Sequence, residues 1–403
     1  MTGRQSMTNS IDQKALDKLR GNWNYPTNLR FGVGRCKELP EICRQLNMHK
    51  PLLVTDVGLA NQPFVADIIK LNEAAGVPTA VFSDVKSNPT GANVEAGVNV
   101  YLQGGHDGVI ALGGGSALDA GKAIALMIGQ KRPLWDFEDV GDNWQRVETT
   151  GMAPTIAIPT TAGTGSEVGR ASVIVDESCH RKKIIFHPNM LPAVVIADPA
   201  LTQGLPAAIT AATGMDAFVH NLEAYCALGY HPMADGIALE GMRLIKEWLP
   251  VAFRHGDDLV ARSHMLVASS MGATAFQKGL GAVHALAHPL GALFDKHHGL
   301  LNAILLPYVL VKNKEAIKAK LTHVARCLDI YDPSFSGFMR WLLEFRAALN
   351  IPADLKAIGI GVEQSALIGQ MAAQDPSASG NPIAFTPERY ADIFVNAVNG
   401  SLQ

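Results

Sequence analysis

Charged residues are scarce in this chain, since Asp, Glu, Lys and Arg together make up 18% of its 403 residues. The 34 Lys and Arg are balanced by 37 Asp and Glu, which gives a formal net charge of -3. Proteins that bind nucleic acid or anionic membranes carry a strong basic excess. We therefore expect neither as a partner and predict a small-molecule ligand.

Paired cysteines and long apolar runs are also missing. The five cysteines include no CxxC pair, which argues against a disulfide framework or a cysteine zinc knuckle. The longest apolar run, around 299–311, is interrupted by Asn302 and Pro307 and is too short to span a bilayer. We expect a cytoplasmic protein without membrane contact, whose residues before about Asp17 form a mobile arm.

Hydrophobic residues, in contrast, make up 48% of the chain. At about 100–200 residues per domain, the length predicts two or three domains with a large apolar core. The low charged fraction favours burial of further surface between copies of the chain. We therefore expect a homo-oligomer, with a dimer as its simplest form.

The first half of the chain alternates short apolar runs with amphipathic segments. Continuous apolar runs are typical of parallel strands that are buried on both faces. After Asp198 these runs stop and long helical patterns follow. We predict an α/β domain over residues 1–199 and an all-α domain over 200–403. The predicted strands are Leu52–Thr55, Ala80–Phe82, Gly108–Leu112, Thr155–Pro159 and Ala193–Ala197, and the clearest predicted helices are Ala207–Leu228, His231–Leu249 and Leu259–Phe276.

A glycine-rich turn, Gly113-Gly114-Gly115-Ser116, joins one predicted strand to a helix that carries Asp119. Glycines let phosphate oxygens approach the backbone, and the start of a helix offers free N–H groups to an anion. The turn is neither GxGxxG nor a Walker loop. A tight connection without a ligand is the alternative interpretation.

A second loop, PTTAGTGSE at residues 159–167, follows the next predicted strand. Two such loops at the ends of neighbouring parallel strands lie where open α/β sheets bind ligands. Asp56 follows the first predicted strand and could hold ribose hydroxyls, although such a residue is more often a cap or a turn residue. The two loops together favour a nucleotide site.

The histidines of the helical half are grouped. Asp216 and His220 lie four residues apart on a predicted helix and share one face, on which Glu223 also falls. One carboxylate with several imidazoles suits Fe, Zn or Co. Spacing alone does not decide which downstream histidines bind. The segment GAVHALAHPLGALFDKHHG supplies His284, His288, His297 and His298.

Four longer segments of the chain, in order, are GGGSALDAGKAIA, PTTAGTGSE, ATGMDAFVHNLEAY and GLGAVHALAHPLGALFDKHHGLLNA. Together they resemble the iron-containing (group III) alcohol dehydrogenases, which share a fold with dehydroquinate synthase and glycerol dehydrogenase. The similarity runs from about Leu52 to Pro307. It implies an N-terminal nucleotide-binding α/β domain and an all-α C-terminal domain, with the active site between them.

The resemblance implies metal ligands at Asp216, His220, His284 and His298, with Fe(II) as the metal and Zn or Co as alternatives. His288 would then face the cavity near the nicotinamide, where an imidazole could pass a proton to solvent. A packing role is the alternative for His288.

The resemblance also implies NAD as the cofactor. Asp56 would bind the adenosine ribose and repel the additional phosphate of NADP. Lys183 would lie at the nicotinamide end. The residues implied around the pyrophosphate are Asn88, Gly114, Gly115, Ser116, Thr160 and Thr161, and Asp119 on the following helix is placed with them.

These parts predict the metal-dependent and NAD-dependent oxidation of a primary alcohol to an aldehyde, or the reverse reduction. A metal lowers the pKa of a bound alcohol, and hydride then passes from the metal-bound alkoxide to the nicotinamide. The second class considered is a dehydroquinate synthase-like lyase, which regenerates NAD within one turnover. Net consumption of NADH with an aldehyde would exclude that lyase.

Two cations bear on the substrate. Arg170 follows the second loop, and Lys278 precedes His284 by six residues, so both could reach the cleft. The Arg and QKGLG pattern is similar to the 4-hydroxybutyrate dehydrogenase branch, in which an ω-hydroxy acid is oxidised to its semialdehyde. A guanidinium can hold such a carboxylate with two hydrogen bonds. Alternatively, both cations pair with Glu167 or the cofactor phosphates, and the pocket takes plain short alcohols.

Overall fold

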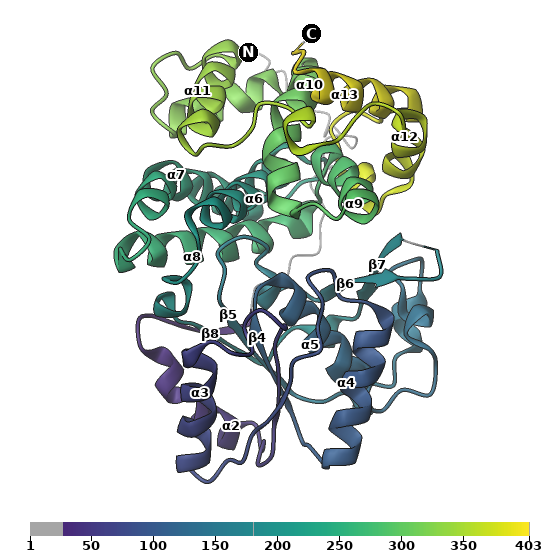
Figure 1. Cartoon of the computed structure of the whole chain (residues 1–403). Helices are drawn as coiled ribbons and strands as arrows, with labels where there is room; N and C mark the ends of the chain where they lie inside the picture. The colour runs from purple at the N-terminus through teal and green to yellow at the C-terminus, as the bar shows by residue number, and fades with distance from the viewer. Residues whose placement is uncertain (1–26, 180, 403) are drawn as a thin grey trace, which may run out of the picture.

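The computed structural model describes residues 27–179 and 181–402, so the arm predicted before Asp17 lies outside the described part. These residues form an α/β domain followed by a helical domain. In Figure 1 the α/β domain is at the bottom and the helical domain is at the top. The predicted fold class is therefore confirmed. A search of the described helices for one long and apolar enough to cross a membrane finds none.

The α/β domain is built on a six-stranded parallel sheet with the strand order β1-β8-β5-β4-β2-β3. The five predicted strands are confirmed to within one residue. β1 was not predicted, because this edge strand is only partly buried and gives no continuous apolar run. The strands are β1 (Asn28–Phe31), β2 (Leu52–Val54), β3 (Ala80–Phe82), β4 (Val109–Gly113), β5 (Thr155–Pro159) and β8 (Val194–Ala197).

The two loops singled out in the sequence leave the sheet at the same edge. Gly113, the last residue of β4, pairs with Pro159, the last residue of β5. Parallel strands end at one edge of a sheet, so the glycine turn and the second loop emerge side by side toward the helical domain. The helices of the α/β domain are α2 (Leu39–Gln45), α3 (Pro63–Ala74), α4 (Gly91–Gly104) and α5 (Gly115–Met127).

An antiparallel hairpin of β6 (Ala171–Asp176) and β7 (Arg181–Phe186) lies beside the main sheet. β6 alternates buried and half-buried residues, which is typical of a strand with one covered face. The hairpin packs against α5 below it and contacts α9 of the helical domain (Figure 1). It therefore lines the junction between the two domains.

The helical domain is centred on α6, which is buried from Thr210 to its end at Cys226. The helices α7, α8 and α10 pack around it. The last strand ends at Ala197, and the boundary predicted after residue 199 falls in the short helix η7 (Pro199–Thr202). The helices are α6 (Ala207–Cys226), α7 (Pro232–Arg254), α8 (Leu259–Ala275), α9 (Ala282–Phe294), α10 (His298–Cys327), α11 (Phe335–Ala348), α12 (Ser365–Gln374) and α13 (Pro387–Asn399).

The start of α10 lies directly on α6 because Gly299 has no side chain. A Cβ at Gly299 would lie 2.4 Å from the carbonyl oxygen of Ala212 and 3.0 Å from Cβ of Asp216. We predict that Gly299→Ala lowers the free energy of unfolding by about 1–3 kcal/mol, because the two helices must move apart. Urea unfolding measures the loss. Gly204→Ala is the control, since nothing lies within 4 Å of its added methyl group; equal loss in both variants would contradict the prediction.

Candidate active site and metal centre

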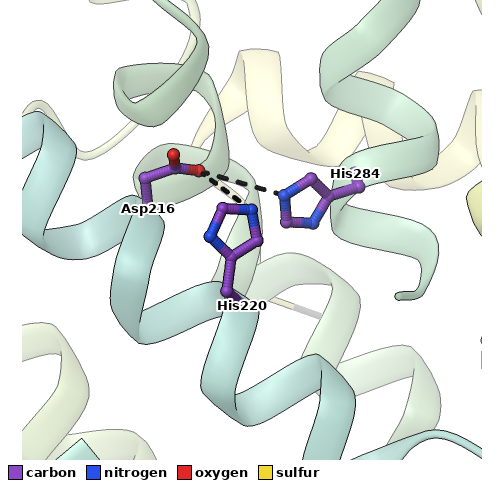
Figure 2. Close-up of side chains that lie close together, drawn as sticks. All are labelled: Asp216, His220 and His284. Carbon is purple, nitrogen blue, oxygen red and sulfur yellow. Dashed lines mark ion pairs between the residues drawn. The ribbon is translucent and has the colours of Figure 1, made fainter. Parts of the chain in front are cut away.

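Asp216, His220 and His284 form the centre of a buried polar cluster between α6 and α9. Asp216 and His220 lie one turn apart on α6, and His284 faces them from the first turn of α9 (Figure 2). Nε2 of His220 and Nε2 of His284 each lie 3.9 Å from Oδ1 of Asp216. One ligand atom from each residue lies within 4.8 Å of the others. A single ion could therefore contact all three side chains.

His298 adds a third imidazole from the first turn of α10. Its Nε2 lies 3.7 Å from the same Oδ1 of Asp216. Asn302, one turn further along α10, donates from Nδ2 to this oxygen at 2.7 Å. The same nitrogen lies 3.2 Å from Nε2 of His284 and 3.1 Å from Nε2 of His298. The lone pairs of one carboxylate oxygen and two imidazoles thus converge on the amide hydrogens of Asn302. A cation in the place of these hydrogens would be stabilised by the same lone pairs.

The ring orientations direct Nε2 toward this point. Nδ1 of His284 lies 2.6 Å from the carboxylate of Glu223, and Nδ1 of His220 lies 3.3 Å from the carbonyl oxygen of Gly163. Nδ1 therefore carries the proton in both rings, and the lone pair is on Nε2. Sequence reasoning placed Glu223 on this face of α6 but gave it no role.

Burial favours the neutral form of the imidazoles of His284 and His298. It lowers the pKa of His284 and of His298 well below the ordinary value for histidine. Burial also raises the pKa of Glu223 to about 7, opposed by the N–H groups of Val283 and Gly281 that bond its carboxylate. Neutral imidazole is the form that binds a metal ion.

A divalent transition metal fits this donor set. Four ligands at the bond lengths of a tetrahedral zinc-type site are about 3.4 Å apart, and the oxygen–nitrogen distances here are 3.7–3.9 Å. The ligand atoms would need to move only slightly closer together to bind one ion. The structure brings Asp216, His220 and His284, which were predicted to share a metal site, close enough for one ion to contact all three, and it places His298 beside them. One carboxylate with imidazoles suits iron, zinc or cobalt.

His288 lies one turn after His284 on α9 and bonds a residue that the sequence analysis missed. Its Nδ1 lies 2.8 Å from the carboxylate of Asp375, and its ring stacks on that of His298 with the centroids 5.4 Å apart. Burial alone would raise the pKa of Asp375, but His288 and the donors of Ser377 outweigh it and hold this pKa below its ordinary value. An ionised Asp375 leaves Nε2 of His288 as the proton acceptor.

A cavity of about 320 Å³ lies near the metal cluster, although none of the four metal-ligand candidates is among the residues that line it. Its walls come from the β6–β7 hairpin, from α8 with the short helix η8 (Phe276–Lys278), and from the short helix η10 (Pro376–Gly380). The ring of Phe276 lies 5.1 Å from that of His220, which connects the cavity to the metal cluster. Its volume is at the small end of ligand pockets.

Arg170 lines this cavity. Its guanidinium lies 5.6 Å from the centre of the Phe186 ring, and it forms no ion pair with any residue in the described part of the chain. Its charge acts on the carboxylate of Asp139, where it opposes the rise in pKa that burial causes. Asp139 is the other charged residue that lines the cavity.

The glycine turn has the features of a phosphate site. A Cβ at Gly115 would lie 2.7 Å from Cγ2 of Thr164, and one at Gly114 would lie 3.3 Å from Cγ2 of Thr161. The α5 helix begins at Gly115 without a side-chain cap, so N–H groups of its first turn face outward. The N–H of Thr160 bonds the carbonyl oxygen of Gly113 at 3.0 Å, which joins the second loop to the turn.

Three further residues predicted for the cofactor lie around this turn. Oδ1 of Asp56 accepts the N–H of Leu59 at 3.0 Å, and Oδ2 of Asp56 would lie 3.4 Å from a Cβ at Gly113. Ser116 donates its hydroxyl to the carbonyl oxygen of Ser87. Asn88 donates to the carboxylate of Asp295 at the end of α9, at 2.9 Å. Asn88 therefore connects the two domains across their junction.

Asp119 is bonded on the inner side of the second loop. Its carboxylate accepts the N–H of Val173 at 2.9 Å and the hydroxyl of Ser166, and it pairs with the buried ammonium of Lys122 at 3.3 Å. These contacts hold the second loop and the hairpin onto α5. In this structure, therefore, Asp119 supports the loop rather than facing the glycine turn.

Lys183 points away from the metal cluster. Its ammonium pairs with Asp176 at 2.9 Å and with Glu138 at 3.5 Å. Lys182 points to the opposite face of β7, where Nζ would lie 3.4 Å from a Cβ at Gly291 in α9. Adjacent residues of a strand face opposite sides, so the structure places Lys182 at the junction between the domains. Strand alternation was the signal that could have found it.

Lys278 is directed away from the cavity. Its side chain is 2% exposed, pairs with Asp235 at 2.5 Å and donates to the carbonyl oxygen of Tyr225 near the end of α6 at 3.1 Å. Lys278 is therefore held by the helical domain, and of the two predicted substrate cations only Arg170 lines the cavity.

Both halves of the chain match known proteins. Residues 26–199 match the family model described as iron-containing alcohol dehydrogenase, and residues 210–398 match that of the C-terminal part of the Fe-containing alcohol dehydrogenase family. The 4-hydroxybutyrate dehydrogenase of Cupriavidus necator is 37% identical over 346 residues, which cover 83% of this chain and 89% of that protein.

Solved structures have the same fold. That of 1,3-propanediol oxidoreductase has a TM-score of 0.89 at 34% identity and covers 94% of this chain and 100% of its own. That of sulfoacetaldehyde reductase from Bifidobacterium kashiwanohense, in complex with NAD+, has a TM-score of 0.85 at 28% identity and covers 94% of this chain and 99% of its own.

The fold and the buried Asp/His centre define a metal-binding oxidoreductase. With matches over both of its halves, the chain belongs to the iron-containing alcohol dehydrogenase family, whose members include NAD-dependent enzymes. It is an enzyme that interconverts alcohols and aldehydes.

We predict that Ala at Asp216, His220, His284 or His298 abolishes activity and weakens metal binding by at least about tenfold, because a ligand is lost. His288→Ala should keep one metal ion per chain while kcat falls by about 10²–10⁴, the usual contribution of a general acid–base residue. Elemental analysis of the purified variants, combined with steady-state kinetics, makes the comparison. A metal-free His288→Ala protein would reverse the assignment.

Proposed function

We propose that this enzyme catalyses the NAD-dependent oxidation of a primary alcohol to an aldehyde, or the reverse reduction. The observation that carries the proposal is the place of the small cavity, because the ring of Phe276, which lines it, lies 5.1 Å from the ring of His220. The glycine turn and the second loop open toward the same junction between the domains. Substrate and nicotinamide can therefore meet beside the cluster.

Each group has a role in this reaction. A divalent ion held by Asp216, His220, His284 and His298 would supply Lewis-acid chemistry that makes the alcohol more acidic. His288 takes the alcohol proton on Nε2, because its Nδ1 is occupied by Asp375. The half-buried ring of His288 then passes this proton toward solvent.

The cofactor prediction concerns Asp56, which lies beside the glycine turn. We expect a preference for NAD(H), because the carboxylate would repel the 2′-phosphate of NADP(H). Asp56→Gly should raise the ratio of kcat/KM with NADP(H) to that with NAD(H) by about tenfold or more. Asp56→Asn keeps the size of the side chain and removes the charge, so it should raise the same ratio. A wild-type enzyme that prefers NADPH would contradict this placement of Asp56.

A second candidate function is narrower, namely the oxidation of an ω-hydroxy acid such as 4-hydroxybutyrate. It is favoured by Arg170, the positively charged residue of the cavity. A 4-hydroxybutyrate dehydrogenase is also among the similar proteins. A guanidinium without an ion-pair partner can bind a carboxylate with two charge-assisted hydrogen bonds.

We predict that Arg170→Ala lowers kcat/KM for 4-hydroxybutyrate by about 10–100-fold, the range expected when charge-assisted hydrogen bonds are lost. The value for 1-butanol should change by less than about threefold. Lys278→Met is the control, because this lysine lies outside the cavity and should affect both substrates alike. Equal losses for both substrates in Arg170→Ala would leave a general primary-alcohol dehydrogenase.

A further inference from the structure

Glu223 on α6 contacts the start of α9, the helix that carries His284, through both of its carboxylate oxygens. It lies two turns after Asp216 on α6, on the same face as Asp216 and His220. Its Oε2 is 2.6 Å from Nδ1 of His284 and accepts the N–H of Gly281 at 3.0 Å. Its Oε1 accepts the N–H of Val283 at 2.8 Å. One buried carboxylate therefore receives three donors from the start of α9.

The close approach depends on Gly281. A Cβ at Gly281 would lie 2.8 Å from Oε1 of Glu223, too close for any side chain there. The α9 helix has no side-chain cap of its own at this residue. The Glu223 carboxylate takes the place of that cap and occupies the positive end of the helix dipole.

The three imidazoles around Asp216 are oriented in different ways. Within residues 27–179 and 181–402, the partner of Nδ1 of His220 is a backbone carbonyl oxygen, that of Gly163, at 3.3 Å. Nδ1 of His298 is buried without a hydrogen-bond partner in the described part of the chain. His284 alone of the three has a carboxylate on Nδ1. A carboxylate on the far nitrogen orients the ring and makes the metal-facing nitrogen a stronger ligand.

We propose that Glu223 is the positioning residue of the metal centre: it fixes the tautomer of His284 and sets the distance between the ligand pair on α6 and the ligand on α9. It acts through His284 and touches neither substrate nor cofactor. The inference rests on the metal-dependent function proposed above, and its tests measure metal binding rather than turnover.

The main experiment compares Glu223→Gln with a matched control, Asn381→Ala. Oδ1 of Asn381 accepts the N–H of Ala282 at 3.2 Å, between the two backbone donors that Glu223 binds, but it does not contact His284. A purely structural role at the start of α9 would thus be shared by both residues. A role in orienting the imidazole would belong to Glu223 alone.

We expect the dissociation constant for Co(II) or Zn(II) to rise by about 10–100-fold in Glu223→Gln and by less than about threefold in Asn381→Ala. The visible absorption spectrum of the Co(II)-loaded protein should change only in Glu223→Gln. In the metal-free state, the Glu223→Gln and Asn381→Ala proteins should unfold at similar temperatures. Unchanged affinity in Glu223→Gln, or an equal loss in both variants, would overturn the inference. A wild type that binds no metal would instead overturn the proposed function.

A measurement on the wild type covers the case in which Glu223→Gln does not fold. Nitrogen-15 shifts of the histidine rings in the Zn(II)-loaded enzyme report which ring nitrogen carries the proton. We expect Nδ1 of His284 to be protonated and Nε2 to be bound to zinc. Protonation of Nε2 would contradict the inference.

Discussion

The structure depends on the convergence of imidazole lone pairs on one buried carboxylate oxygen. Oδ1 of Asp216 lies within 3.7–3.9 Å of Nε2 of three histidines. Burial holds His284 and His298 in the neutral form, so these rings do not supply the charge that would balance a buried carboxylate. An uncompensated buried charge is costly. The amide of Asn302 provides donors, and a divalent cation would supply the missing charge.

The second loop connects this centre to the nucleotide half. The carbonyl oxygen of Gly163 accepts from His220, while Thr164 packs against Gly115 in the glycine turn. Gly163 itself lies against α6, since a Cβ there would be 2.8 Å from Cβ of Thr213. The same loop therefore holds a metal ligand at one point and contacts the start of α5 at another. This loop therefore sets the position of the metal cluster relative to the glycine turn.

Much of the fold could be predicted because buried parallel strands are continuous apolar runs. The β6–β7 hairpin was not predicted, although the alternation of buried and half-buried residues in β6 is typical of a strand with one covered face. In the site, the four-residue spacing was sufficient to predict that Asp216 and His220 share one face of a helix. The choice among the downstream histidines needed the family resemblance. Asp375 lies 87 residues after His288, and no local pattern connects them.

The two lysines show a different limit of sequence reasoning. Lys182 and Lys183 are neighbours, and only the register of β7 decides that Lys182 faces the domain junction. Lys278 is near His284 in sequence, but a buried ion pair with Asp235 holds it away from the cavity. Tertiary contacts decided the direction of these side chains, and spacing along the chain does not contain that information.

The most direct test of this account is anomalous X-ray scattering at the iron absorption edge from crystals of the Fe(II)-loaded enzyme with NAD. The account predicts one strong peak per chain, within bonding distance of Asp216, His220, His284 and His298. A peak elsewhere in the chain would contradict it. So would the absence of a peak after loading with iron, zinc or cobalt in turn, each measured at the absorption edge of that metal.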